Sequence, residues 1–147
     1  MTRKLPELNL SIQYPGGKSD APTRPEIRRW VRASCDCPAE IAVRLVNADE
    51  GRVLNRDYRG KDYATNVLSF PYEQNEVVQG DLVLCIPVVA AEAREQGKSL
   101  LHHYAHMIVH GMLHLQGYDH ETSRRDAKKM ESREREILAT LDIPDPY

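Results

Sequence analysis

The segment from His110 to His120 carries three histidines in the order His-x3-His-x5-His, and it constrains the fold more than any other stretch. Apolar residues recur upstream at steps of three and four, the pattern of an amphipathic helix with one face against a core: Leu101, Tyr104, Ala105, Ile108, Met112 and Leu115. His110 and His114 are therefore expected on the other side. Residues four apart lie one helical turn above one another, so these two imidazoles can bind one metal ion.

A third ligand for such an ion has to come from beyond the helix. With a rise of about 1.5 Å per residue, His106 lies about 12 Å from His114 along the axis, too far to share a metal. Gly117 can end the helix, because glycine readily adopts the left-handed conformation, and the chain can then bring His120 beside the other two. Three neutral ligands with an open fourth position are typical of catalytic zinc, so we predict one Zn²⁺ per chain.

Other interpretations of these side chains stay open. Two histidines four apart on a polar helix face are often solvated surface. We expect His102, His103 and His106 at the surface, along a groove or behind the ligands, while His106 and His110 have the same spacing and form a rival ligand pair. The Cys35-Asp-Cys37 pair has no second pair at matching distance, so we favour ordinary helix-end residues there over a metal site.

Length and composition indicate one domain spanning residues 1–147 with an ordinary core. The formal net charge of -2 gives no overall preference for nucleic acid. No signal peptide is recognisable at the start, and the most apolar run, residues 82–91, is too short to span a bilayer. An odd number of cysteines, three, fits a reducing compartment. We therefore expect a cytoplasmic protein without membrane contact; its oligomeric state is not indicated.

The remaining patterns predict an α+β fold. Apolar alternation or apolar runs predict four strands, near residues 8–12, 41–45, 67–70 and 80–86. Pro71 places the third of these strands at an edge of the sheet or ends its pairing. Capping residues and helical spacing predict about five helices: one opened by the Thr23-x-x-Glu26 capping box, one over 49–60, one over 88–96, the histidine helix capped by Ser99, and a last one capped by Thr122 or Ser123. The expected architecture is a mixed sheet with helices packed over it and the histidine helix near the centre.

Three further motifs accompany the histidine segment: Leu54-Asn-x-x-Tyr58-Arg59-Gly-Lys61-Asp62, Thr65-x-Val-Leu-Ser-Phe-Pro71 and Gly80-Asp81-Leu82. Together with His110-Gly-x-Leu-His114-Leu-x-Gly117-Tyr-Asp-His120, they closely resemble the YbeY family of bacterial rRNA maturation factors. The resemblance runs from about the second strand to His120. It implies a zincin-like fold and a single-strand-specific, metal-dependent endoribonuclease. It also implies partners, namely single-stranded rRNA and the small ribosomal subunit, in 3′-end maturation and ribosome quality control.

The same resemblance assigns roles to single residues. His110, His114 and His120 match the family's three zinc ligands, and Arg59 matches its functionally important arginine. We expect Arg59 to act in catalysis by holding the scissile phosphate with its planar guanidinium, with Lys61 as a further substrate contact. The alternative for Arg59 is a salt bridge that orders its loop. One departure is Asn66, which stands where the family usually has an acidic residue.

Zinc held by neutral imidazoles would lower the pKa of bound water toward about 7 and polarise a phosphoryl oxygen, although the ribose 2′-OH could equally be the nucleophile. A zinc protease is one alternative, but Gly111 stands where His-Glu-x-x-His proteases carry their general base. The other alternative is a ribosome assembly factor with a structural zinc, closed for instance by Asp119.

Overall fold

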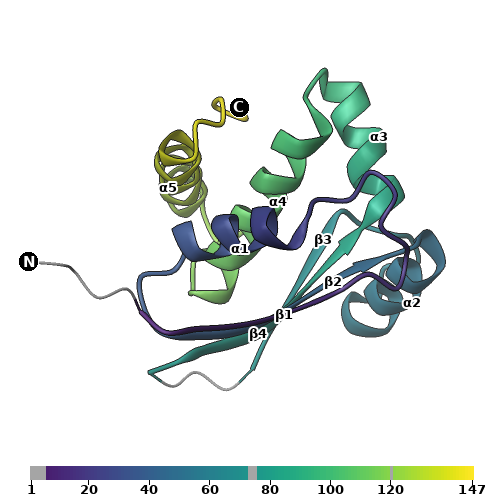
Figure 1. Ribbon diagram of the computed structural model, residues 1–147, viewed down its shortest axis with the longest axis horizontal. Helices are drawn as coiled ribbons and strands as arrows, with labels where there is room; N and C mark the ends of the chain where they lie inside the picture. The colour runs from purple at the N-terminus through teal and green to yellow at the C-terminus, as the bar shows by residue number, and fades with distance from the viewer. Residues whose placement is uncertain (1–5, 73–75, 120) are drawn as a thin grey trace, which may run out of the picture.

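The computed structural model describes residues 6–72, 76–119 and 121–147 (Figure 1). In this part of the chain, four strands and five helices follow one another in the order β1 (Leu8–Gln13), α1 (Arg24–Ala33), β2 (Ala39–Val46), α2 (Ala48–Arg59), β3 (Val67–Pro71), β4 (Val78–Cys85), α3 (Ile86–Gln96), α4 (Leu100–Leu115) and α5 (Arg124–Thr140). The predicted α+β class and the predicted number of elements are confirmed.

The strands form one mixed sheet in the order β1-β2-β4-β3. Strands β1, β2 and β4 run parallel, whereas β3 pairs antiparallel with β4, with Leu68 opposite Val83. Pro71 closes β3 at the edge of the sheet, where a missing N–H donor is tolerated, as its sequence position predicted. Strand β3 is therefore an edge strand, which pairs with β4 on one side and, within the described part of the chain, with no other strand on its other side.

Helix α4 lies at the centre of the fold and is buried nearly all round. The predicted core face is present, with Tyr104, Ile108 and Met112 almost fully buried, but Leu101 at its start is 42% exposed. The opposite side is not open either, because α3 and α5 pack against the helix, and His103 and His106 are 1% and 7% exposed. Of the positions expected for His103 and His106, the surface is therefore wrong, whereas a position along a groove or behind the ligands is not contradicted.

Helix ends follow the predicted capping residues. Thr23 and Glu26 form the reciprocal capping box of α1, and the hydroxyls of Ser99 and Ser123 accept backbone N–H groups at the starts of α4 and α5. Helix α3 begins two residues before its predicted start, because Pro87 is accommodated in the first turn. After α4, Gly117 has φ +100°, the left-handed conformation expected of the residue that turns the chain.

Helix α2 packs on the opposite face of the sheet from α1 and α4, as Figure 1 shows. The close approach is made at Gly51, where an added Cβ would lie 3.0 Å from the sulfur of Cys85. Few apolar side chains of α2 are buried, and Val53 and Tyr58 are 41% and 70% exposed. The helix ends beside β3, so its last residues reach the same sheet edge that α4 approaches from the other face.

Among the described residues, no helix combines the length and the apolar character needed to cross a membrane.

A candidate catalytic cleft at the sheet edge

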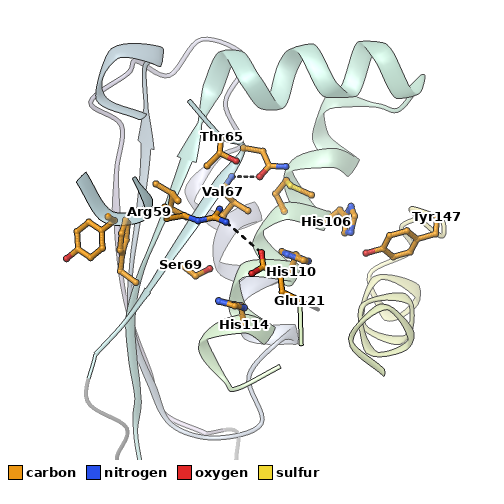
Figure 2. A pocket seen from close by; sticks show the side chains of 14 residues that line it. Arg59, Thr65, Val67, Ser69, His106, His110, His114, Glu121 and Tyr147 are labelled. Carbon is orange, nitrogen blue, oxygen red and sulfur yellow. Dashed lines mark hydrogen bonds and ion pairs between the residues drawn. The ribbon is translucent and has the colours of Figure 1, made fainter. Parts of the chain in front are cut away.

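A cleft of about 490 Å³ runs along β3 between the end of α2 and helix α4 (Figure 2). Its lining includes Tyr58 and Arg59 from α2, Ser69 from β3 and two histidines of α4, His110 and His114. Ser69 joins the two sides, because its hydroxyl donates to the carbonyl of Gly111 over 3.3 Å. Two of the three predicted metal-binding histidines and the predicted phosphate-binding arginine thus line one cavity.

His110 and His114 project into this cleft one turn apart (Figure 2). His120, the third predicted ligand, lies outside the described residues. Within the ranges that are described, no group of three or more histidine, cysteine, aspartate or glutamate side chains is arranged to hold a metal ion. The described part of the site therefore supplies two of the three predicted nitrogen ligands.

Behind His110 lies Glu134, a fully buried carboxylate of α5. It accepts hydrogen bonds from His110 Nδ1 at 2.6 Å, from His106 Nε2 at 3.1 Å and from the hydroxyl of Tyr147. Burial alone would raise the pKa of this carboxyl, but the hydrogen bonds from His106, His110 and Tyr147 outweigh it and lower the pKa to about 2. Glu134 is therefore a buried anion that fixes the orientation of His110.

This arrangement bears on the choice of ligand pair. Since His110 donates through Nδ1, its lone pair lies on Nε2, the nitrogen that can bind a metal. His106 instead donates through Nε2 to the same carboxylate, and its ring contacts the ring of Tyr147 with centroids 5.4 Å apart. The geometry favours His110 with His114 over the rival pair of His106 and His110.

A second carboxylate, Glu92 of α3, meets the same helix one turn earlier. It accepts from His103 Nε2 at 2.9 Å and from the amide of Asn66 at 3.1 and 3.2 Å. Asn66 Oδ1 also accepts the N–H of Val67 at 2.6 Å. The side-chain amide of Asn66 therefore donates to the carboxylate of Glu92, and this hydrogen bond connects the start of β3 to α3.

Arg59 lies on the outer side of the cleft, and its guanidinium faces the carboxylate of Glu121 at 3.7 Å (Figure 2). Both side chains are open to solvent, 47% and 66% exposed. Lys61 is also exposed, but the described lining of the cleft includes Arg59 and not Lys61. Nearby Arg52 forms an ion pair with Asp62 at 2.7 Å and is not part of the described lining. Arg59 is therefore the arginine that can contact a ligand in the cleft.

Two other sequence motifs have a structural explanation. At Gly111, an added Cβ would lie 2.8 Å from a methyl carbon of Leu82 and 3.2 Å from the hydroxyl of Ser69, so this position faces the sheet. Cys35 and Cys37 are half-buried at the end of α1, and burial raises the pKa of the Cys35 thiol to about 11. At such a pKa the Cys35 thiol is neutral near pH 7 and weakly nucleophilic.

Glu134 and Tyr147 are site residues that the sequence analysis missed. A signal for Glu134 does exist, because it stands between Met130 and Ile137 at helical spacing on the buried side of α5, where an acidic residue is out of place. For Tyr147 there is no such signal, since it follows a segment rich in proline and aspartate beyond the last helix.

Comparison with known proteins gives relatives over nearly the whole chain. A family model described as Endoribonuclease YbeY matches residues 21–142. The chain is 56% identical over 144 residues to the Endoribonuclease YbeY of Thiobacillus denitrificans, covering 97% of each. It is 60% identical over 143 residues to that of Aromatoleum aromaticum, covering 95% of this chain and 92% of the relative. The solution structure of TM1509 from Thermotoga maritima is similar in fold, with a TM-score of 0.57 at 27% identity, covering 93% of this chain and 97% of that one.

Proposed function

Because this chain belongs to the YbeY family of endoribonucleases, we propose that it is a zinc-dependent endoribonuclease that cleaves single-stranded RNA in the cleft along β3. The substrate we propose is rRNA of the small ribosomal subunit, in maturation of its 3′ end and in ribosome quality control in the cytoplasm. The whole chain, residues 1–147, would act as one catalytic domain. The observation that carries this proposal is the shared cleft of His110, His114 and Arg59.

His110, His114 and His120 would hold one zinc ion. The described residues fit this role, because His110 donates its Nδ1 proton to a buried carboxylate, the contact that metal-binding histidines usually make. A bound Zn²⁺ would supply a Lewis acid for the phosphodiester. The protein's own contribution is then to hold the His110 ring in a fixed direction, which Glu134 does from behind through its contact with Nδ1.

We assign Arg59 to the scissile phosphate. Its ion pair with Glu121 is long and exposed, and such pairs contribute only about 0–1 kcal/mol. A phosphate can therefore replace Glu121 at small cost, and a guanidinium can bind it with two parallel N–H donors. Lys61, outside the lining of the cleft, would contact a more distant phosphate of the strand.

The alternative functions have less support. A protease of the His-Glu-x-x-His kind needs its glutamate beside the first histidine, but position 111 is packed against Leu82 and Ser69 with no room for one. An assembly factor with a structural zinc would need a closed fourth coordination position, for instance by Asp119, but Asp119 is not among the described residues that line the cleft.

The proposal is tested with the purified protein, with and without a chelator, on single-stranded RNA, duplex RNA and a peptide. We expect cleavage of the single strand alone, its loss on chelation and its return with Zn²⁺. Peptide cleavage would support the protease, and undiminished RNA cleavage after complete metal removal would refute the zinc requirement.

A further inference from the structure

Tyr58 is a large aromatic residue that the fold does not bury. It is 70% exposed at the end of α2, immediately before Arg59, and it lines the same cleft. Burial against the sheet does not explain an aromatic residue here, because the buried residues of α2 are Gly51 and Asn55. A solvated aromatic ring next to a phosphate-binding cation is the combination that proteins use for unpaired nucleotides.

The ring of Tyr58 is held in place from one side. Its centroid lies 4.3 Å from that of Phe70, at an interplanar angle of 63°, which is an edge-to-face contact. Phe70 itself packs against the small apolar cluster between α2 and the sheet, made up of Val46, Leu68, Val83 and Cys85. Tyr58 is thus supported by the core while most of its surface stays open, so a ligand can stack on it at little entropic cost.

We propose that Tyr58, supported by Phe70, is a stacking subsite for one unpaired nucleobase of the strand whose phosphate Arg59 binds. The inference rests on the proposed function and deepens it. A base within a duplex is stacked between its neighbours and cannot reach such a ring, whereas a base of a single strand can turn outward onto it. Every base has a π-face, so the subsite selects for unpaired RNA and not for sequence.

Binding of a short fluorescent single-stranded oligoribonucleotide tests this subsite. All variants carry His114→Ala so that the strand is not cut during the titration. We expect Tyr58→Ala to weaken binding about tenfold and Tyr58→Phe to stay within about twofold, because phenylalanine keeps the ring. Tyr63→Ala is the matched control: Tyr63 is also exposed, at 57%, but it lies outside the described lining of the cleft, and its loss should leave affinity unchanged.

A second probe separates stacking from a general loss of affinity. Oligoribonucleotides with one abasic position, placed in turn along the strand, should bind the parent protein more weakly at one position. At that position alone, Tyr58→Ala should have no additional effect. The inference is overturned if Tyr58→Ala binds as tightly as its parent, or if its loss of affinity is the same for every abasic probe. If the parent binds the oligoribonucleotide and Tyr58→Ala binds it equally well, only the subsite is refuted. If the unmutated protein neither binds nor cleaves single-stranded RNA, the proposed function is refuted and the subsite with it.

Discussion

The two walls of the cleft differ in how firmly their side chains are held. The inner wall consists of His110 and His114 on α4, with Glu134 behind them at 0% exposure. The outer wall consists of Tyr58, Arg59 and Phe70, at the end of α2 and on β3. On the inner wall a buried carboxylate bonds to His110 at 2.6 Å, whereas the cation of the outer wall has an exposed ion pair at 3.7 Å.

This difference matches two different tasks. A metal ion that stays bound needs ligands whose direction is fixed before it arrives, and a buried network of hydrogen bonds provides that. A substrate that binds and leaves needs groups that exchange one partner for another, and exposed side chains do this at small cost. We therefore expect changes to the inner wall to affect zinc and changes to the outer wall to affect RNA.

The largest expected effect is at the inner wall, for His114→Ala. It removes one of three proposed ligands, so bound zinc should fall from one per chain to near none and cleavage of single-stranded RNA should be abolished. Elemental analysis of the purified variant measures the zinc. His102→Ala is the matched control, since His102 is on the same helix but does not line the cleft. Unchanged zinc in His114→Ala would remove this residue from the site.

At the outer wall, Arg59→Glu should lower the rate of RNA cleavage by about 100-fold or more, because it replaces a phosphate-binding cation with an anion. Zinc content and thermal stability should stay as in the parent. Arg59→Lys should fall between the two, since lysine keeps the charge and loses the planar pair of donors. Full activity of Arg59→Glu would contradict the phosphate role and favour a salt bridge that merely orders the loop.

A smaller effect is expected for Glu134→Gln, which keeps the shape of the side chain and removes its charge. Loss of the carboxylate behind a metal-binding histidine typically weakens metal binding about 10- to 100-fold. Competition with a chromogenic chelator measures this affinity. Glu92→Gln serves as the comparison, because Glu92 contacts His103 and Asn66 and neither predicted ligand of α4. Equal losses in both variants would indicate general destabilisation instead of orientation of His110.

The smallest expected effect lies between the walls, at Asn66. Asn66→Ala removes the amide donor to Glu92 and the acceptor of the Val67 N–H, so the free energy of unfolding should fall by about 1–2 kcal/mol. Urea denaturation measures the change. Zinc content should be unaffected, and a marked loss of zinc would mean that the start of β3 takes part in building the metal site.

The sequence predicted local features of this molecule well. Helix caps such as Thr23, Ser99 and Ser123, the edge position of β3 and the turn at Gly117 depend on neighbours a few residues away, and they are confirmed. The prediction that Arg59 shares a site with His110 and His114 depended on the family resemblance, because nothing in the spacing of these segments requires it.

Contacts between distant segments could not be predicted in the same way. Glu134 is 24 residues from His110, and its place on the apolar stripe of α5 indicates burial but does not indicate that its partner is His110. His103 meets Glu92 of α3 and His106 meets Glu134 of α5, and a helical periodicity drawn from α4 alone contains no information on either partner. The side of the sheet on which α2 packs was equally beyond local patterns.

The most direct test of the central claim is an anomalous diffraction map at the zinc absorption edge, from crystals of the zinc-loaded protein. We predict one peak in the cleft, at about 2.0–2.1 Å from one nitrogen each of His110, His114 and His120, with the fourth position of the ion open to solvent. A peak at another place, such as beside Cys35 and Cys37, or a fourth protein ligand that closes the site would contradict it.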